Sequence, residues 1–140
     1  MAKGDAESAQ PLAQAMVDAV PDTLSNHVLL ANILVALNRG EESLPHYQAA
    51  VNAEPARGEI RYNYAVALTQ CGRYAGAVTQ YEEALKLAPY QPVIHHGYAV
   101  ALEKLGRIQE AIAQEREALR LQPGLQEAKE NLERLSAATK

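Results

Sequence analysis

The sequence predicts an all-α fold in which copies of one helix pair form a linear array. Four prolines recur every 34 residues along the 140-residue chain, at Pro21, Pro55, Pro89 and Pro123. Columns of alanine and leucine repeat with the same period. A fixed period of about 20–50 residues is typical of solenoids, in which each unit buries its apolar faces against its neighbours. The sequence therefore predicts a short solenoid with a continuous core.

Residues 58–91 form the clearest copy of the unit. Apolar and small side chains at Tyr64, Ala65 and Leu68 have the spacing of a first helix. Gly72 then interrupts the pattern, because glycine readily adopts the left-handed conformation that closes a helix. The equivalent positions of the other copies hold residues that tolerate this conformation: Gly4, Asn38 and Gly106.

A second helix is predicted over residues 74–87 of the same copy. The small residues Ala77 and Ala84 allow two helices to approach closely, and Tyr81 is expected to fill the space between neighbouring units. Pro89 ends this helix, because proline cannot continue the helical hydrogen bonds and biases its predecessor away from helical geometry.

Two further prolines, Pro11 and Pro45, fall inside the second helices of earlier copies. Proline is tolerated only in the first turn of a helix, so these two helices are expected to start late or to bend. We expect a local irregularity without a functional role at both places.

The array begins with an incomplete unit, because residues 4–23 match only the turn and the second helix. Without a first helix, one face of this unit is predicted to be open to association: Ala9, Ala13, Met16 and Val17. One interpretation is a fragment of a longer protein or a degenerate cap. The other is that a second molecule covers the face and gives a homo-oligomer.

The array ends with a predicted capping helix over residues 126–138. Its apolar side chains form one stripe at helical spacing: Leu125, Ala128, Leu132 and Leu135. Charged residues cover the rest, which is typical of a helix that seals a repeat array against water. Glu130 and Arg134 are spaced as a favourable i,i+4 ion pair.

The unit resembles the tetratricopeptide repeat. The residues of the central copy that carry the resemblance are Tyr64, Ala65, Leu68, Gly72, Tyr74, Ala77, Tyr81, Ala84 and Pro89. The resemblance implies an all-α, right-handed α-solenoid with repeats at 24–57, 58–91 and 92–125, a half repeat at 4–23 and a C-terminal capping helix at 126–138. The third repeat departs from the pattern, because Glu115 stands where an aromatic residue is expected.

The same resemblance implies a concave groove, lined by the first helices, that binds a protein or peptide partner. The expected groove residues are Val28, Asn32, Val35, Tyr62, Asn63, Val66, Thr69, Gln70, His96, Val100, Glu103 and Lys104. Tyr62 and Asn63 are the favoured recognition residues, since an apolar anchor beside an amide suits a peptide backbone. Val28 and Leu29 either join this patch or only pack against the incomplete first unit.

One role of the family, binding the acidic C-terminus of a chaperone, can be tested on the sequence. That role uses two asparagines with several cations as a carboxylate clamp, and Asn32 and Asn63 match the asparagines. Val28, Val93 and Gly97 stand where the cations are required. Without cations nothing offsets the desolvation of the carboxylates, so chaperone-tail binding is not expected.

Composition argues against several other classes of function. The net charge is −4 without a lysine or arginine cluster, which is unsuited to nucleic acid, and no apolar run is long enough to insert in a membrane. His46 stands alone on its predicted helix, and His27 and His95 lie two units apart. The sequence therefore predicts no metal site, no cofactor and no enzymatic activity. The lone Cys71 suits a reducing, cytoplasmic compartment.

The function predicted from these observations is that of a protein-interaction scaffold or adaptor, which binds an extended or short helical segment of its partner. Two alternatives remain open at this point. The chain is a recruiting or regulatory segment of a larger enzyme, since arrays of this kind precede glycosyltransferase-type catalytic domains. Otherwise it is a scaffold that self-assembles through its uncapped N-terminal end.

Overall fold

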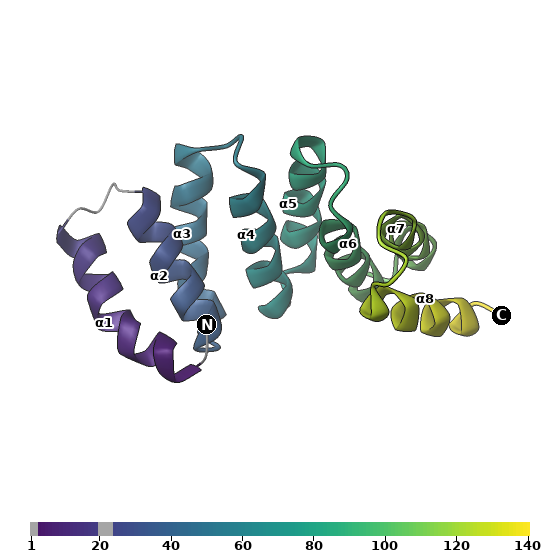
Figure 1. Ribbon diagram of the computed structural model, residues 1–140, viewed down its shortest axis with the longest axis horizontal. Helices are drawn as coiled ribbons and strands as arrows, with labels where there is room; N and C mark the ends of the chain where they lie inside the picture. Colours follow the sequence, from purple (N-terminus) through teal and green to yellow (C-terminus); the bar gives the residue numbers. More distant parts are fainter. Residues whose placement is uncertain (1–2, 20–23) are drawn as a thin grey trace.

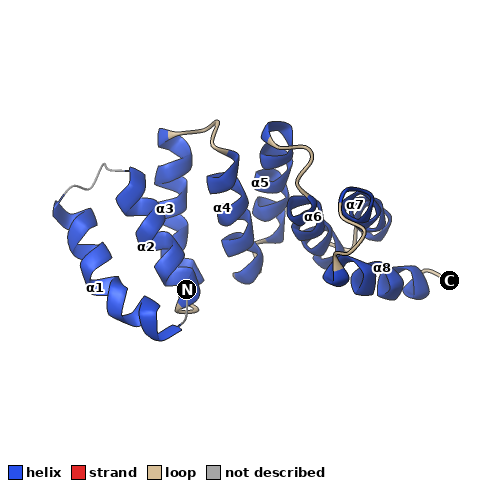
Figure 2. Cartoon of the chain, in the orientation of Figure 1, coloured by secondary structure: helices blue, strands red, loops and turns tan. Residues whose placement is uncertain are grey.

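The computed structural model describes residues 3–19 and 24–140, and within these ranges the regular structure consists of eight α-helices. The helices follow in the order α1 (Lys3–Ala19), α2 (Leu24–Ala36), α3 (Gly40–Ala53), α4 (Gly58–Gln70), α5 (Tyr74–Leu87), α6 (Pro92–Lys104), α7 (Ile108–Leu121) and α8 (Gln126–Ala138). Figure 2 shows these helices joined by loops, without strands in the described part of the chain. The prediction of an all-α solenoid is confirmed.

Neighbours along the chain are also neighbours in space. Each helix packs mainly on the one before it and the one after it, as the succession of ribbons along the long axis shows (Figure 1). Helices α2 and α3, α4 and α5, and α6 and α7 form three pairs joined by short turns. Helices α1 and α8 flank these pairs. This arrangement places the first helices α2, α4 and α6 in a row.

The turn inside each pair has the left-handed residue that the sequence predicts. Asn38, Gly72 and Gly106 have φ angles of 60°, 73° and 77°. The next residue donates its N–H back to the closing helix, and in the central pair the bond from Arg73 to the carbonyl of Leu68 is 2.8 Å long. This hydrogen bond belongs to the Schellman motif, which ends a helix.

One prediction about a helix start is wrong, and for the two helices with an internal proline the late start is excluded while the bend stays a prediction. Gly4 does not form a turn, because α1 already begins at Lys3. Pro11 and Pro45 lie inside α1 and α3, and neither helix starts late. The turn at Asn38 fixes the start of α3 at Gly40, which puts Pro45 beyond the first turn. Pro21, which was expected to end the first of these helices, lies outside the described residues.

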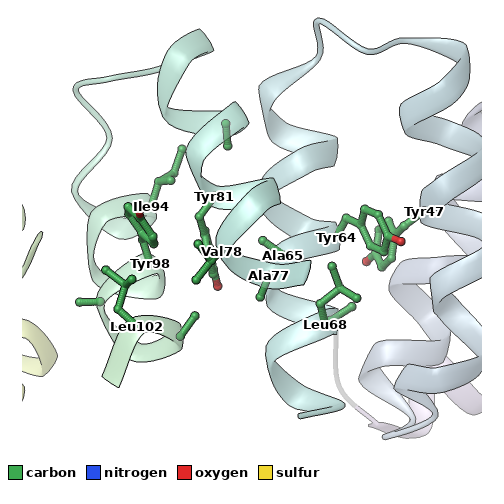
Figure 3. Packing of buried hydrophobic residues seen from close by; sticks show 14 of the residues in the cluster. Tyr47, Tyr64, Ala65, Leu68, Ala77, Val78, Tyr81, Ile94, Tyr98 and Leu102 are labelled. Carbon is green, nitrogen blue, oxygen red and sulfur yellow. The ribbon is translucent and has the colours of Figure 1, made fainter. Parts of the chain in front are cut away.

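Small residues bring the helices together, and tyrosines fill the space between repeats. Ala77 and Ala84, predicted at the close contacts, are fully buried. So are four further alanines at repeating positions: Ala50, Ala65, Ala99 and Ala118. Figure 3 shows Tyr47 beside Tyr64, and their ring centroids are 6.0 Å apart. The rings of Tyr81 and Tyr98 repeat this stack one unit later, at 6.3 Å. Burial raises the pKa of Tyr81 to about 12, so its hydroxyl stays neutral.

Helix α1 packs on α2 through a small cluster of its own, formed by Ala6, Ala13, Leu30, Ile33 and Leu34. Ala13 is only 1% exposed, so this member of the predicted association face is not available to a second molecule. The physical reason is its position in the repeat, since the equivalent Tyr47 also faces the following first helix. Ala9 is half-buried and Met16 is exposed. The side chain of Val17 lies outside the described residues.

Candidate functional site

Hollows lie on the described part of the surface formed by the first helices and α8, where successive helices of this row contact one another only sparsely. The hollow between α4 and α6 has a volume of about 230 Å³ and is lined by Gly58, Glu59, Tyr62, Ala88, Gln91, Val93 and Ile94. The second hollow lies between α6 and α8 and is lined by His96, Val100, Glu127, Glu130, Asn131 and Arg134. The first is mostly apolar, whereas the lining of the second includes the charged residues Glu127, Glu130 and Arg134.

All the predicted groove residues keep some surface in contact with solvent. Asn32, Gln70 and Lys104 are exposed. The other nine are half-buried: Val28, Val35, Tyr62, Asn63, Val66, Thr69, His96, Val100 and Glu103. Tyr62 lines the apolar hollow, while His96 and Val100 line the charged one. The predicted residues are thus divided between two hollows.

The side chain of Tyr62 is fixed by a contact with Tyr81, whereas the side chain of its neighbour Asn63 has no hydrogen bond to the described residues. The ring of Tyr62 packs at 6.2 Å from the ring of Tyr81, and burial raises the pKa of the Tyr62 hydroxyl. The side-chain amide of Asn63 makes no hydrogen bond with the described residues, and none of its polar atoms is sealed from solvent. An amide in this state offers a donor and an acceptor to a bound backbone.

Gly97 explains how Tyr81 reaches this surface, and sequence reasoning did not assign it this role. A Cβ atom at Gly97 would lie 2.7 Å from the Tyr81 hydroxyl oxygen and 2.8 Å from two ring carbons. Glycine is therefore required for the close approach of the ring to α6.

Glu115, which replaces the expected aromatic residue, is fully buried beneath the second hollow. Its carboxylate lies 3.0 Å from Nδ1 of His96 through both oxygens, and it accepts a hydrogen bond of 2.5 Å from the amide of Asn131. The hydrogen bond that His96 donates to the Glu115 carboxylate is the largest cause of a raised pKa at His96, and the charge of Glu127 also raises it. A buried carboxylate is stable only with such partners.

Arg134 has a different partner from the one predicted. Its guanidinium donates to both oxygens of Glu103 on α6, at 2.6 and 2.7 Å, rather than to Glu130. This hydrogen bond holds the pKa of Glu103 below its usual value. Arg134 also donates to the side chain of Asn131. The predicted i,i+4 pair is wrong because a bidentate contact across two helices competes for the same guanidinium.

His46 is not isolated, contrary to the sequence prediction. Its Nδ1 lies 2.9 Å from Nδ1 of His27 on α2, and the two rings are 5.2 Å apart. Burial, with a smaller effect of His27, holds the pKa of His46 below its usual value. The available signal was a comparison of equivalent positions, since each repeat has a pair of polar residues at the positions of His27 and His46. The described residues contain no cluster of three or more histidine, cysteine or acidic side chains suited to a metal.

Cys71 and the described helices add no further chemistry. Burial and the nearby Glu41 raise the pKa of the Cys71 thiol, which disfavours the reactive thiolate. Among the described helices none combines the length and apolar character needed to cross a membrane.

Comparison with known families settles what kind of array this is. Two models described as tetratricopeptide repeat match residues 28–92 and 72–128, which together cover most of the chain. The chain belongs to the tetratricopeptide-repeat family. No curated protein matches it significantly.

Solved structures of this repeat protein's fold agree with the family assignment. A structure of MamA, 14% identical, superposes with a TM-score of 0.91 over 98% of this chain and 80% of MamA. YrrB, which is 20% identical, superposes with a TM-score of 0.87 over 91% of this chain and 66% of YrrB. The first repeat domain of Spaghetti (RPAP3), 22% identical, gives 0.76 over 78% of this chain and 86% of that domain. At these identities the likeness concerns the fold, and membership of the family supports a general role in protein interaction.

Proposed function

We propose that this repeat protein is a non-enzymatic adaptor that binds an extended or short helical segment of a partner in the groove of its first helices. Tyr62 and Asn63 on α4 form the centre of the proposed site. The observation that carries the proposal is the half-buried amide of Asn63, which has no hydrogen bond within the described chain, beside a tyrosine ring fixed by Tyr81. Such a pair combines an apolar anchor with backbone recognition.

The apolar hollow next to Tyr62 supports the same proposal. Val93 and Ile94 line it from α6, and Ala88 lines it from the preceding loop. Its volume of about 230 Å³ suits one apolar side chain of a partner better than a cofactor, since small-molecule pockets run to roughly 300–1,000 Å³. A partner segment would place an apolar residue here and hydrogen-bond its backbone to Asn63.

Two similar structures are described in terms of peptides. Spaghetti (RPAP3) is bound to the HSP90 peptide SRMEEVD, and YrrB is described as having an unusual peptide-binding site. The groove proposed here differs from an acidic-peptide site, because Val28, Val93 and Gly97 carry no charge and Arg134 is paired with Glu103. We therefore expect that SRMEEVD does not bind this chain, and fluorescence polarisation with a labelled peptide measures this.

The proposal is tested by selecting peptides from a displayed random library on the purified protein. We expect the wild type to enrich peptides with an apolar residue at one fixed position. The double variant Tyr62→Ala/Asn63→Ala should lose at least about tenfold in affinity for the selected peptides, which corresponds to a hot spot of 1.4 kcal/mol.

A matched control is Tyr74→Ala, which removes a half-buried tyrosine from α5 outside the row of first helices. The control should bind the selected peptides like the wild type. Equal binding by the wild type and a folded double variant would contradict the proposed site, and no enrichment at all would contradict groove binding itself.

A second candidate function, self-association through α1, is favoured by two exposed apolar residues. Leu12 is 67% exposed and Met16 is 37% exposed, although the alanines equivalent to Met16 in the complete repeats, Ala50, Ala84 and Ala118, are fully buried. We propose this face as a dimer contact. Light scattering after gel filtration should then give twice the chain mass, and Leu12→Lys should restore the monomer mass.

A further inference from the structure

We propose that His27 and His46 form a binding site for a divalent transition-metal ion, with copper(II) bound most tightly. The two imidazoles come from α2 and α3, the two helices of the first repeat, and each is half-buried. Their Nδ1 atoms are 2.9 Å apart. Neutral imidazole is the commonest protein ligand of such ions, and two imidazole nitrogens here face one another across a helix pair.

The distance between the nitrogens is compatible with a tetragonal coordination geometry. Two neighbouring nitrogens of a square-planar or tetragonal site, each roughly 2.0–2.1 Å from the metal, are roughly 2.8–3.0 Å apart. A tetrahedral site at the same bond lengths would separate them by about 3.3–3.4 Å. The observed 2.9 Å lies in the tetragonal range and is also the ordinary length of the hydrogen bond that joins the rings without a metal, so the spacing permits this geometry once each ring rotates toward the ion. Tetragonal nitrogen sites suit copper(II) and nickel(II), and copper(II) has the higher affinity.

Without a metal the same two atoms share a hydrogen bond, in which Nδ1–H of one ring donates to Nδ1 of the other. On metal binding the donor ring moves this proton to its Nε2 atom, so both Nδ1 lone pairs turn to the ion. The neutral pair releases no net proton in this step. The ion would link α2 to α3, and metal binding would therefore stabilise the first repeat.

The other repeats show that the fold does not require two histidines at this place. Arg61 and Gln80 are hydrogen-bonded at 3.0 Å in the second repeat. His95 and Gln114 lie 2.7 Å apart in the third. Glutamine at position 46 would thus reproduce a contact that the array already uses. The structure supplies two metal ligands, and water or a partner side chain would complete the coordination.

The test titrates copper(II) chloride into the untagged full chain, followed by calorimetry and electron paramagnetic resonance. We expect one copper(II) per chain, an axial spectrum with two coordinated imidazole nitrogens, and weaker binding of nickel(II). His46→Gln should lower the copper affinity at least about tenfold, since even changes outside the ligand set cost 10–100-fold. Circular dichroism without metal checks that this variant stays folded.

Gln114→His tests the same idea by gain of function, because it would create a second histidine pair with His95. We expect a second copper(II) ion per chain in this variant. No binding to the wild type, equal binding by His46→Gln, or a spectrum without imidazole nitrogens would overturn the proposal. Copper bound to the N-terminal amine instead would give equal binding by the wild type and His46→Gln. A Gln114→His chain that binds no second ion would equally contradict the assigned geometry.

Discussion

At the boundary between α5 and α6 a tyrosine ring fills the space between repeats, whereas at the boundary between α7 and α8 a carboxylate stands in the equivalent position. Tyr81 stacks on Tyr98 and touches Tyr62, and Gly97 makes room for its ring. At the second boundary Glu115 takes the place of Tyr81. Its neighbours change with it, since His96 replaces Tyr62 and Asn131 replaces Gly97.

The comparison shows that one position in a repeat can be filled in two physically different ways. The tyrosine stabilises its boundary by burying a large apolar surface, and the ring of Tyr81 leaves no room for a Cβ atom at Gly97. Tyr47 in the first repeat has Asn63 at the equivalent position, so the glycine belongs to this boundary alone. The carboxylate is smaller, so the side chain of Asn131 fits beside it. Its charge must be compensated, and His96 and Asn131 supply the donors. Between these two boundaries the residue and its contacts therefore differ together.

The largest expected effect on stability comes from removing the tyrosine ring at the boundary between α5 and α6. Tyr81→Ala should lower the free energy of unfolding by about 3–5 kcal/mol, because a large buried ring leaves a cavity between two repeats. Urea denaturation followed by circular dichroism measures the change. The exposed Thr79 on the same helix provides the control, and Thr79→Ala should stay within about 0.5 kcal/mol of the wild type. A loss below about 1 kcal/mol for Tyr81→Ala would contradict a stabilising role of the ring at this boundary.

A smaller loss is expected at the polar boundary. Glu115→Ala should cost about 1–3 kcal/mol, because it leaves the donors of His96 and Asn131 unsatisfied but creates a smaller cavity. Glu115→Gln keeps the shape and one acceptor, so we expect it to recover part of this loss. Urea denaturation again gives the values. Equal or greater stability of Glu115→Ala would show that the network does not stabilise the fold.

Substitution by alanine is expected to change the free energy of unfolding in opposite directions at two glycines. Gly97→Ala should destabilise by about 1–3 kcal/mol, since its Cβ would collide with the Tyr81 ring at 2.7 Å. Gly76→Ala on α5 meets only ordinary contacts with Leu68 and should stabilise by about 0.4–1 kcal/mol. Thermal melts of both variants decide this. In a chain that already carries Tyr81→Ala, Gly97→Ala should no longer destabilise the fold. If it still does, the destabilisation does not come from contact with the Tyr81 ring.

The smallest predicted effect is a dependence of the polar boundary on pH. His96 has a raised pKa, so its contribution to stability is fully present below its usual value of 6.5 and is lost as the pH rises through the higher pKa of the folded protein. The stability difference between the wild type and His96→Gln should therefore shrink between about pH 5.5 and pH 8.5. Urea midpoints across this range measure it, and a difference that grows with pH would contradict the assignment.

Much of the architecture could be predicted from the spacing of a few residues. The turns at Asn38, Gly72 and Gly106 follow from local backbone preference, and the helix ends before Pro55 and Pro89 follow from the chemistry of proline. The predicted start of α1 was wrong, because the helix begins at Lys3 and runs through Gly4, which was predicted to lie in a turn.

The candidate groove was predicted less completely than the fold. Tyr62 and Asn63 lie on the row of first helices as expected, but the role of Gly97 in admitting Tyr81 was missed. The partner of Arg134 was also wrong, because a guanidinium reaches residues of another helix as easily as those of its own. Sequence spacing describes neighbours within one helix, and these contacts join different helices.

The sequence alone determined the repeat length, the helix pairs, the turns and the family, because each depends on local conformation or on a period written along the chain. Only the tertiary structure decided that His27 meets His46 and that Glu115 is buried with His96 and Asn131. These contacts join residues 16 or 19 positions apart. They depend on how each helix is rotated against its neighbour, and packing of the whole array sets that rotation.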